Sequence, residues 1–83
     1  MFSINHIRPN FTRVDLPSLT VWFSYRTPIA FSQGGTITAR ENDWGPTTGR
    51  HLNDVQPRHD LRIKGEAFQA ALEKAWQDAK GEQ

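Results

Sequence analysis

The sequence contains no cysteine among its 83 residues. This absence excludes disulfide bonds and thiolate zinc sites, and it fits a reducing compartment. The formal net charge is only +1, so attraction to nucleic acid or to an anionic membrane would have to come from a local patch. No basic segment followed by a long apolar run occurs, so we expect a soluble intracellular protein without a signal peptide or membrane span.

A linker rich in glycine, serine or proline is also missing, as are internal repeats, so we expect residues 1–83 to form one small domain. A chain of this length buries only about 60 to 65% of the surface that its unfolded form exposes. Five Phe, three Trp and one Tyr are therefore important, because they supply large apolar areas from few positions.

The first half of the chain has the alternating pattern of β-strands. Residues 11–16, 18–25, 29–32 and 36–40 are separated by turn signals, and Gly34-Gly35 supplies the positive φ angles that a tight hairpin needs. In the second of these runs, period two directs four apolar side chains toward the core and leaves Trp22 on the outer face. The four expected core residues are Leu19, Val21, Phe23 and Tyr25.

The second half changes to a helical period. Residues 66–80 place Phe68, Leu72 and Trp76 on one side and charged or amide side chains on the other, which predicts an amphipathic helix. The sheet face is the only apolar surface of matching size. We therefore predict an α+β fold: an antiparallel three- or four-stranded sheet (about 11–40), a short helix (about 47–56) and a C-terminal amphipathic helix (about 66–80), with the helices packed on one face.

The segment ENDWGPTTGRHLN, residues 41–53, has two interpretations. In the structural one, Pro46 or the two threonines begin the short helix, a threonine hydroxyl caps it, and Trp44 and Leu52 fix it on the core. In the functional one, Thr47, Thr48, Arg50 and His51 lie at a helix N-terminus that favours an anion such as phosphate. A phosphate-binding loop would contain more glycine and a lysine, so this signal is weak.

The connector that follows is locally basic. Arg50, Arg58, Arg62 and Lys64 outnumber the two nearby aspartates. Such cations usually neutralise neighbouring acids on a solvated surface. The alternative is a phosphate-contacting patch, which together with Trp22 could hold a single strand of nucleic acid.

Two segments carry a resemblance to a known group of proteins. The combination of VWFSYRTPIAFS and RENDWGPTTGRHLN resembles small, mostly uncharacterised bacteriophage proteins that share a Ser-Tyr-x-Thr-Pro hairpin and a Trp-x-x-Thr-Thr-x-x-His-Leu segment. The similarity covers about residues 19–55. It implies a phage origin, a small accessory protein and a location in the bacterial host cytoplasm, and it supplies no activity for the residues of the short helix.

Catalytic patterns are weak in this sequence. Its three histidines lack the i,i+4 spacing of a zinc protease, the serines lack a strand–elbow–helix motif, and the carboxylates are ordinary polar residues. A dry concave pocket is also difficult to build in so short a chain. We therefore expect a protein that is not an enzyme, with no catalytic residue, no metal and no cofactor.

The leading hypothesis is a non-catalytic phage accessory protein that binds a host or phage protein, acting as an inhibitor of a host enzyme or defence complex. Aromatic and arginine side chains carry much of the binding energy at interfaces, which points to Trp22, Arg26, Arg50 and His51 as partner-binding residues. Residues 36–40 could form a homo-oligomer through an edge strand. The alternatives are a nucleic-acid-binding protein that uses the basic connector 50–64 and a minor virion component.

Overall fold

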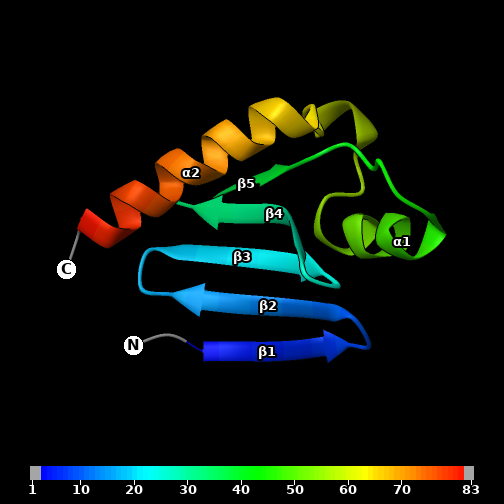
Figure 1. Ribbon diagram of the computed structural model, residues 1–83, viewed down its shortest axis with the longest axis horizontal. Coiled ribbons are helices and arrows are strands. Elements are labelled where there is room, and N and C mark those ends of the chain that lie inside the picture. Colours follow the sequence, from blue (N-terminus) through cyan, green and yellow to red (C-terminus); the bar gives the residue numbers. More distant parts are fainter. Residues whose placement is uncertain (1–2, 82–83) are drawn as a thin grey trace.

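The computed structural model describes residues 3–81 and has the predicted α+β architecture (Figure 1). Five strands come first in the chain, and the helices follow. The strands are β1 (Ser3–Arg8), β2 (Phe11–Leu16), β3 (Leu19–Ser24), β4 (Thr27–Gln33) and β5 (Thr36–Ala39), and the helices are α1 (Pro46–Val55), the 3-10 turn η1 (His59–Leu61) and α2 (Gly65–Gly81).

The five strands form one antiparallel meander in the order β1-β2-β3-β4-β5. Gly34 and Gly35 have φ angles of 60° and 82° in the β4–β5 hairpin, which confirms the role expected for this pair. The sheet has five strands instead of the three or four that we predicted. The additional first strand, β1, pairs with β2 through a turn at Asn10, whose φ is 62°. Its sequence SINHIR has no strong alternation, so β1 depends on its neighbour for its conformation.

The two faces of the sheet follow from the register of the central strands. Val21 lies opposite Phe31 across the β3–β4 pair, while Trp22 lies opposite Ala30. Because neighbouring residues of a strand point to opposite faces, these two pairs belong to different sides of the sheet. Each side carries its own core cluster.

Helix α2 covers the face of Val21 and Phe31, as predicted. Phe68 is fully buried there, and its ring lies 5.7 Å from the ring of Phe31. The helical stripe is not buried along its whole length, however, since the side chain of Trp76 remains 43% exposed near the far end of the helix. The cluster consists of Leu19, Val21, Phe31, Phe68 and Ala75, with Leu72 and Phe23 partly buried against it.

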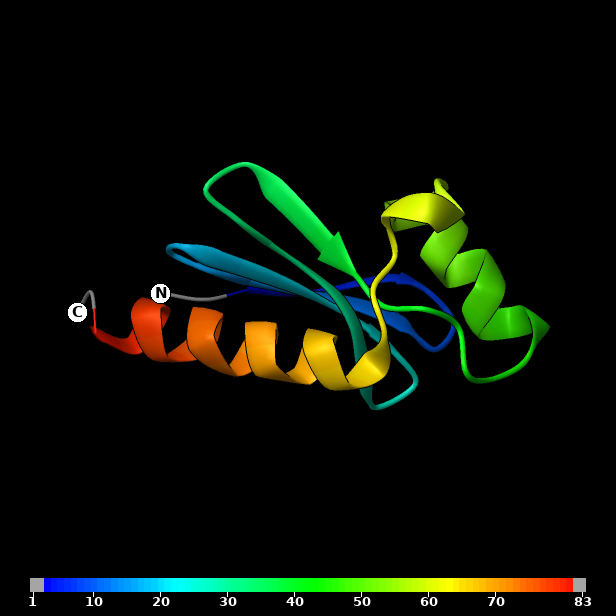
Figure 2. The same ribbon diagram turned by 90° about the horizontal axis from the view of Figure 1, so that it is seen from above.

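Helix α1 packs against the opposite face, at one end of the sheet (Figure 2). Its Leu52 is fully buried, in a cluster whose strand residues share the side of Ala30. The expectation that both helices lie on one side was therefore wrong. The physical reason is that β3 and β4 carry buried residues on both faces, so each face requires a cover. The cluster under α1 contains Phe11, Ile29, Ala30, Ala39 and Leu52, with Trp22 and Val55 packed against it.

Arg40 connects the two halves of the fold. It follows β5 and forms a parallel bridge with Ile63, just before α2 begins. Its guanidinium carbon lies 4.5 Å from the ring centroid of Trp44 and 6.0 Å from that of Phe68, and the group passes so close to Gly65 that a Cβ there would overlap it. Glycine at the first position of α2 therefore leaves room for this arginine.

Candidate functional site

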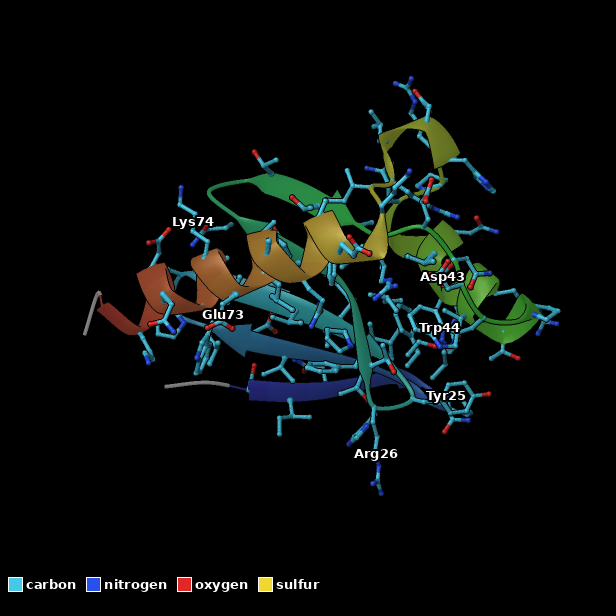
Figure 3. The ribbon with its side chains drawn as sticks, turned by 45° about the horizontal axis from the view of Figure 1, so that its top comes forward. Tyr25, Arg26, Asp43, Trp44, Glu73 and Lys74 are labelled. Atoms are coloured by element: carbon cyan, nitrogen blue, oxygen red, sulfur yellow. The ribbon has the colours of Figure 1, made fainter. Side chains whose placement is uncertain are left out.

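A small pocket opens where the β3–β4 turn meets the loop that precedes α1. Its volume is about 200 Å³. Figure 3 shows that Tyr25 and Trp44, which come from these two distant segments, lie at the same end of the molecule. The pocket is lined by Ser24, Tyr25, Thr27, Ile29, Trp44 and Thr48.

Tyr25 forms one wall of this pocket. We predicted that its ring would face the core, and that was wrong: β3 ends at Ser24, and the side chain of Tyr25 is 55% exposed. Its φ of 58° lies in the left-handed region, which a bulky residue rarely adopts. The backbone N–H of Tyr25 donates a 2.7 Å hydrogen bond to the carbonyl oxygen of Asn10, so the neighbouring hairpin holds this turn in place.

Trp44 forms the opposite wall. Its side chain is 46% exposed, so it does not fix the corner on the core as we expected. The ring is held instead by the guanidinium of Arg40, and the backbone N–H of Trp44 donates a 2.9 Å hydrogen bond to the side-chain oxygen of Asn42. The exposed indole thus has a supported position beside the pocket.

The floor of the pocket contains a buried polar network. The hydroxyl oxygen of Ser24 lies 2.7 Å from Nδ1 of His51 and 2.9 Å from the hydroxyl oxygen of Thr48. The imidazole also stacks on the ring of Phe11, with centroids 4.5 Å apart and planes 5° apart. Sequence reasoning missed this network, because the three polar residues come from β3 and α1 and only folding brings them together.

A serine hydroxyl beside an imidazole nitrogen is the contact that activates a nucleophile in hydrolases. Here Ser24 is only 2% exposed and His51 only 3%, and Thr48 occupies the other side of the serine hydroxyl. We therefore assign this contact a structural role, in which it attaches α1 to β3. Burial lowers the pKa of His51, and the nearby Arg8 cation lowers it further, so the network favours a neutral ring.

The predicted partner-binding residues have different environments. Arg26 and Arg50 are exposed, and the side chain of Arg26 extends away from the sheet (Figure 3). His51 is buried in the network. Trp22 is partly buried against the core cluster under α1, so it is not the exposed anchor that we expected. The face of Trp22 is the one that α1 covers.

The proposed anion site at the start of α1 is not assembled as we predicted. The helix begins at Pro46 after Gly45, and no side chain caps it. Thr47 is partly buried, and the hydroxyl of Thr48 is directed to Ser24 rather than to the first turn. The threonine cap that we expected is therefore replaced by a contact with the sheet.

The basic connector uses two of its cations within the fold. Arg58 forms a 2.6 Å ion pair with Asp60. Arg62 is buried, and its guanidinium donates hydrogen bonds to the carbonyl oxygen of Gln56 and to the side chain of Asn53, which satisfies groups at the end of α1. Lys64 is exposed just before α2. The four connector cations thus do not form one surface patch.

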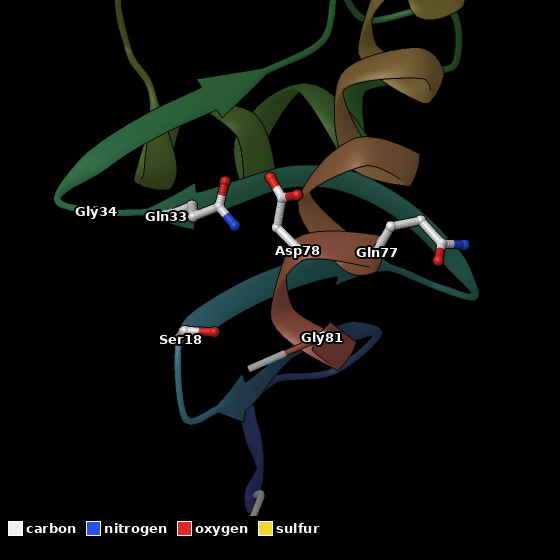
Figure 4. A pocket seen from close by; sticks show the side chains of 6 residues that line it. All are labelled: Ser18, Gln33, Gly34, Gln77, Asp78 and Gly81. Carbon is white, nitrogen blue, oxygen red and sulfur yellow. The ribbon is translucent and has the colours of Figure 1, made fainter. Parts of the chain in front are cut away.

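The surface also has larger hollows than this pocket. A polar depression of about 740 Å³ lies at the C-terminal end of α2, where the β2–β3 turn and the β4–β5 hairpin approach it, and Figure 4 shows its lining side chains. Gln33 in this depression donates a 3.3 Å hydrogen bond to the carbonyl oxygen of Ala75 and so serves to hold α2. No group of three or more potential metal ligands occurs within residues 3–81. In that range no helix is long and apolar enough to cross a membrane.

The pocket between Tyr25 and Trp44 thus offers two aromatic walls, an apolar contact at Ile29 and hydroxyl groups at its base. No curated protein and no solved structure matches the chain. The model of a family of unknown function, DUF8033, matches residues 3–71, which include all five strands, α1 and the first turns of α2. The chain therefore belongs to the DUF8033 family.

Proposed function

We propose that this protein is a non-catalytic binding module that recognises another protein through Tyr25, Trp44 and Arg26. A side chain of the partner enters the pocket between the two rings, and the exposed Arg26, which follows Tyr25 in the chain, adds a polar contact outside the pocket. Tyrosine, tryptophan and arginine are the residues that most often dominate the energy of protein interfaces, because they combine large contact areas with hydrogen-bonding groups.

The observation that carries this proposal is the conformation of Tyr25. Two non-glycine residues in the described range have positive φ, and the other is Asn10, a residue type that tolerates this region well. A tyrosine at such a position costs stability, and its ring stays half-exposed, with the buried ring of His51 6.5 Å away. Strain of this kind is concentrated at functional sites, so a ring held outward at the mouth of a pocket points to recognition.

The resemblance to small bacteriophage proteins indicates which class of partner to expect. It favours a host or phage protein in the bacterial cytoplasm. Inhibition of a host enzyme or defence complex is the activity that such binding would give a small domain without catalytic machinery. The alternative of nucleic-acid binding receives less support, because Arg58 and Arg62 of the connector are engaged within the fold.

The test uses two tryptophans of nearly equal exposure on different surfaces. Trp44 is 46% exposed beside the pocket, and Trp76 is 43% exposed on α2. The tagged protein and its Trp44→Ala and Trp76→Ala variants would be used to capture partners from infected cells. We expect a captured protein to be lost with Trp44→Ala and retained with Trp76→Ala, with binding weaker by about 2 kcal/mol or more if the indole is a dominant anchor.

Three results would contradict the proposal. Capture could be equally strong with Trp44→Ala, it could depend on Trp76 instead, or the protein could recover nucleic acid or assembled virions without a variant-sensitive protein partner. Thermal unfolding of both variants separates a lost contact from a lost fold, because Trp44 also supports Arg40.

A further inference from the structure

Strand β1 forms one edge of the sheet, and neither helix covers it. It pairs with β2 on one side only. Its six residues contain no proline and no acidic side chain, and the arginine stands at its last position. Soluble proteins usually protect such an edge with proline, inward-pointing charges or a covering segment, because its free backbone groups can pair with another strand.

The other edge of the sheet is protected. Strand β5 has only four residues, and the connector crosses its end. There the backbone N–H of Ile63 donates to the carbonyl oxygen of Ala39, and the N–H of Glu41 donates to the carbonyl oxygen of Ile63, at 2.9 Å and 2.7 Å. The edge that the sequence suggested for oligomerisation, residues 36–40, is therefore shorter and partly occupied.

An apolar strip leads from the open edge into the sheet. Ile4 of β1 lies opposite Val14, which lies opposite Val21, so all three share the face that α2 covers. Helix α2 leaves this half of the face open, and a groove of about 610 Å³ remains between Trp76 and the strip. The side chain of Ile4 is 55% exposed next to this groove. The remaining groove residues are Leu16, Leu19, Phe23, Pro28, Leu72 and Glu73.

We propose that a second copy of this chain occupies this edge, with the two β1 strands paired antiparallel about a two-fold axis. The second copy supplies what the edge lacks: a strand of equal length with free backbone groups and an isoleucine on the same face. Isologous pairing of this kind is the commonest symmetry of soluble oligomers.

The charges of β1 favour the antiparallel arrangement. Arg8 stands at the C-terminal end of the strand, where it forms an ion pair with Asp54 of α1, so antiparallel pairing places these two ion pairs at opposite ends of the interface, whereas parallel pairing would bring them together. Near-neutral net charge also keeps repulsion between whole copies small. A peptide from a different protein could pair with the same edge. A second β1 strand, however, already provides the backbone groups and the isoleucine that the edge needs.

A register centred on Asn5 uses the regular part of the strand. Asn5 of one copy then lies opposite Asn5 of the other, and Ile4 lies opposite His6, which points to the same face. The result is one continuous sheet with both α2 helices on one side. The two Tyr25 pockets lie at opposite ends of this assembly, so the dimer would present two copies of the binding site to partners.

The absence of cysteine gives this proposal a direct test. Residues directly opposite each other in an antiparallel pair have Cα atoms about 4.5 to 5.5 Å apart, a range that disulfides accept. Asn5→Cys should therefore form a covalent dimer on mild oxidation. Ile37→Cys, on the other edge, is the control. It should remain mostly monomeric although Ile37 is exposed, at 41%, because that edge lies outside the proposed interface.

Sedimentation velocity of the cysteine-free protein gives an independent measurement. We expect a mass of two chains at high concentration, loss of the dimer with Ile4→Lys, and retention with Ile37→Lys. Circular dichroism would verify that the lysine variants are folded, as expected from the exposure of both isoleucines. A monomer at all concentrations, a dimer that depends on Ile37, or efficient cross-linking only through Ile37→Cys would overturn the proposal.

Discussion

The Nδ1 atom of His51 lies 2.7 Å from the hydroxyl oxygen of Ser24, so one hydrogen bond joins helix α1 to the end of strand β3. Ser24 is followed directly by Tyr25, whose ring forms a wall of the candidate pocket. The contact therefore positions the pocket relative to α1 and contributes to stability at the same time. The first two predictions below concern this pair.

Replacing Ser24 by alanine should lower the free energy of unfolding by about 1 to 3 kcal/mol, because it leaves buried polar groups of His51 and Thr48 without their partner. Urea denaturation would measure the loss. Ser18→Ala is a suitable control, because Ser18 lies in the β2–β3 turn and is only partly buried. Equal stability of the two variants would show that the network does not hold α1.

Acidification should destabilise the protein through His51. Burial, followed by the nearby Arg8 cation, holds the pKa of His51 below its ordinary value of 6.5. As the pH falls, His51 therefore binds a proton in the unfolded chain before it does so in the folded protein. The contribution of His51 to the free energy of unfolding is fully present above about pH 6.5 and is lost progressively as the pH falls toward the lower pKa of the folded state.

The measurement is the free energy of unfolding at about pH 7.5 and about pH 5.5, for the native protein and for His51→Gln. The variant should be less stable at the higher pH but should lose less on acidification. His59→Gln controls for removal of a histidine as such, since His59 is exposed. Identical pH dependence in the native protein and His51→Gln would exclude this histidine as the source.

Gly65→Ala should destabilise the fold by about 1 kcal/mol, although alanine is normally the better helix former. The new Cβ would fall 2.8 Å from the guanidinium carbon of Arg40, a side chain only 12% exposed and packed over Trp44. Thermal unfolding would show the cost. The loss of stability caused by Gly65→Ala should be smaller when Arg40 is also replaced by alanine. Gly81→Ala is the control, because the position has open space around it, and this variant should be neutral or slightly stabilising. An unchanged cost without Arg40 would contradict this explanation.

Tyr25→Asn should separate stability from binding. Asparagine tolerates the positive φ of this position, and the tyrosine ring is 55% exposed, so the variant should be as stable as the native protein or more stable by about 1 kcal/mol. If Tyr25 serves recognition, the same variant should capture less of the partner protein. A variant that is clearly less stable would mean that the ring supports the fold rather than the site.

Several elements could be predicted from the sequence because their signals are local. Helix α2 follows from the spacing of Phe68 and Leu72, the β4–β5 hairpin follows from Gly34-Gly35, and Pro46 begins α1. Strand β1 could not be predicted in this way, since its conformation depends on pairing with β2. The signal that could have revealed it is Asn10, a residue suited to a tight turn before the first predicted strand.

The candidate site was harder to predict. The sequence placed Arg26 correctly on the surface, but it assigned the exposed aromatic role to Trp22 rather than to Tyr25 and Trp44. Alternation within a strand shows that two sets of side chains point in opposite directions. It does not show which face a later helix will cover or where the strand ends.

The sequence by itself thus determined the fold class, the order of the elements and the amphipathic character of α2, because each depends on residues close together in the chain. Only the tertiary structure decided that α1 and α2 cover opposite faces, that Ser24 meets His51, and that Tyr25 and Trp44 enclose a pocket. These relationships join segments about 20 or more residues apart. They form because apolar side chains on both faces of the sheet must be buried away from water.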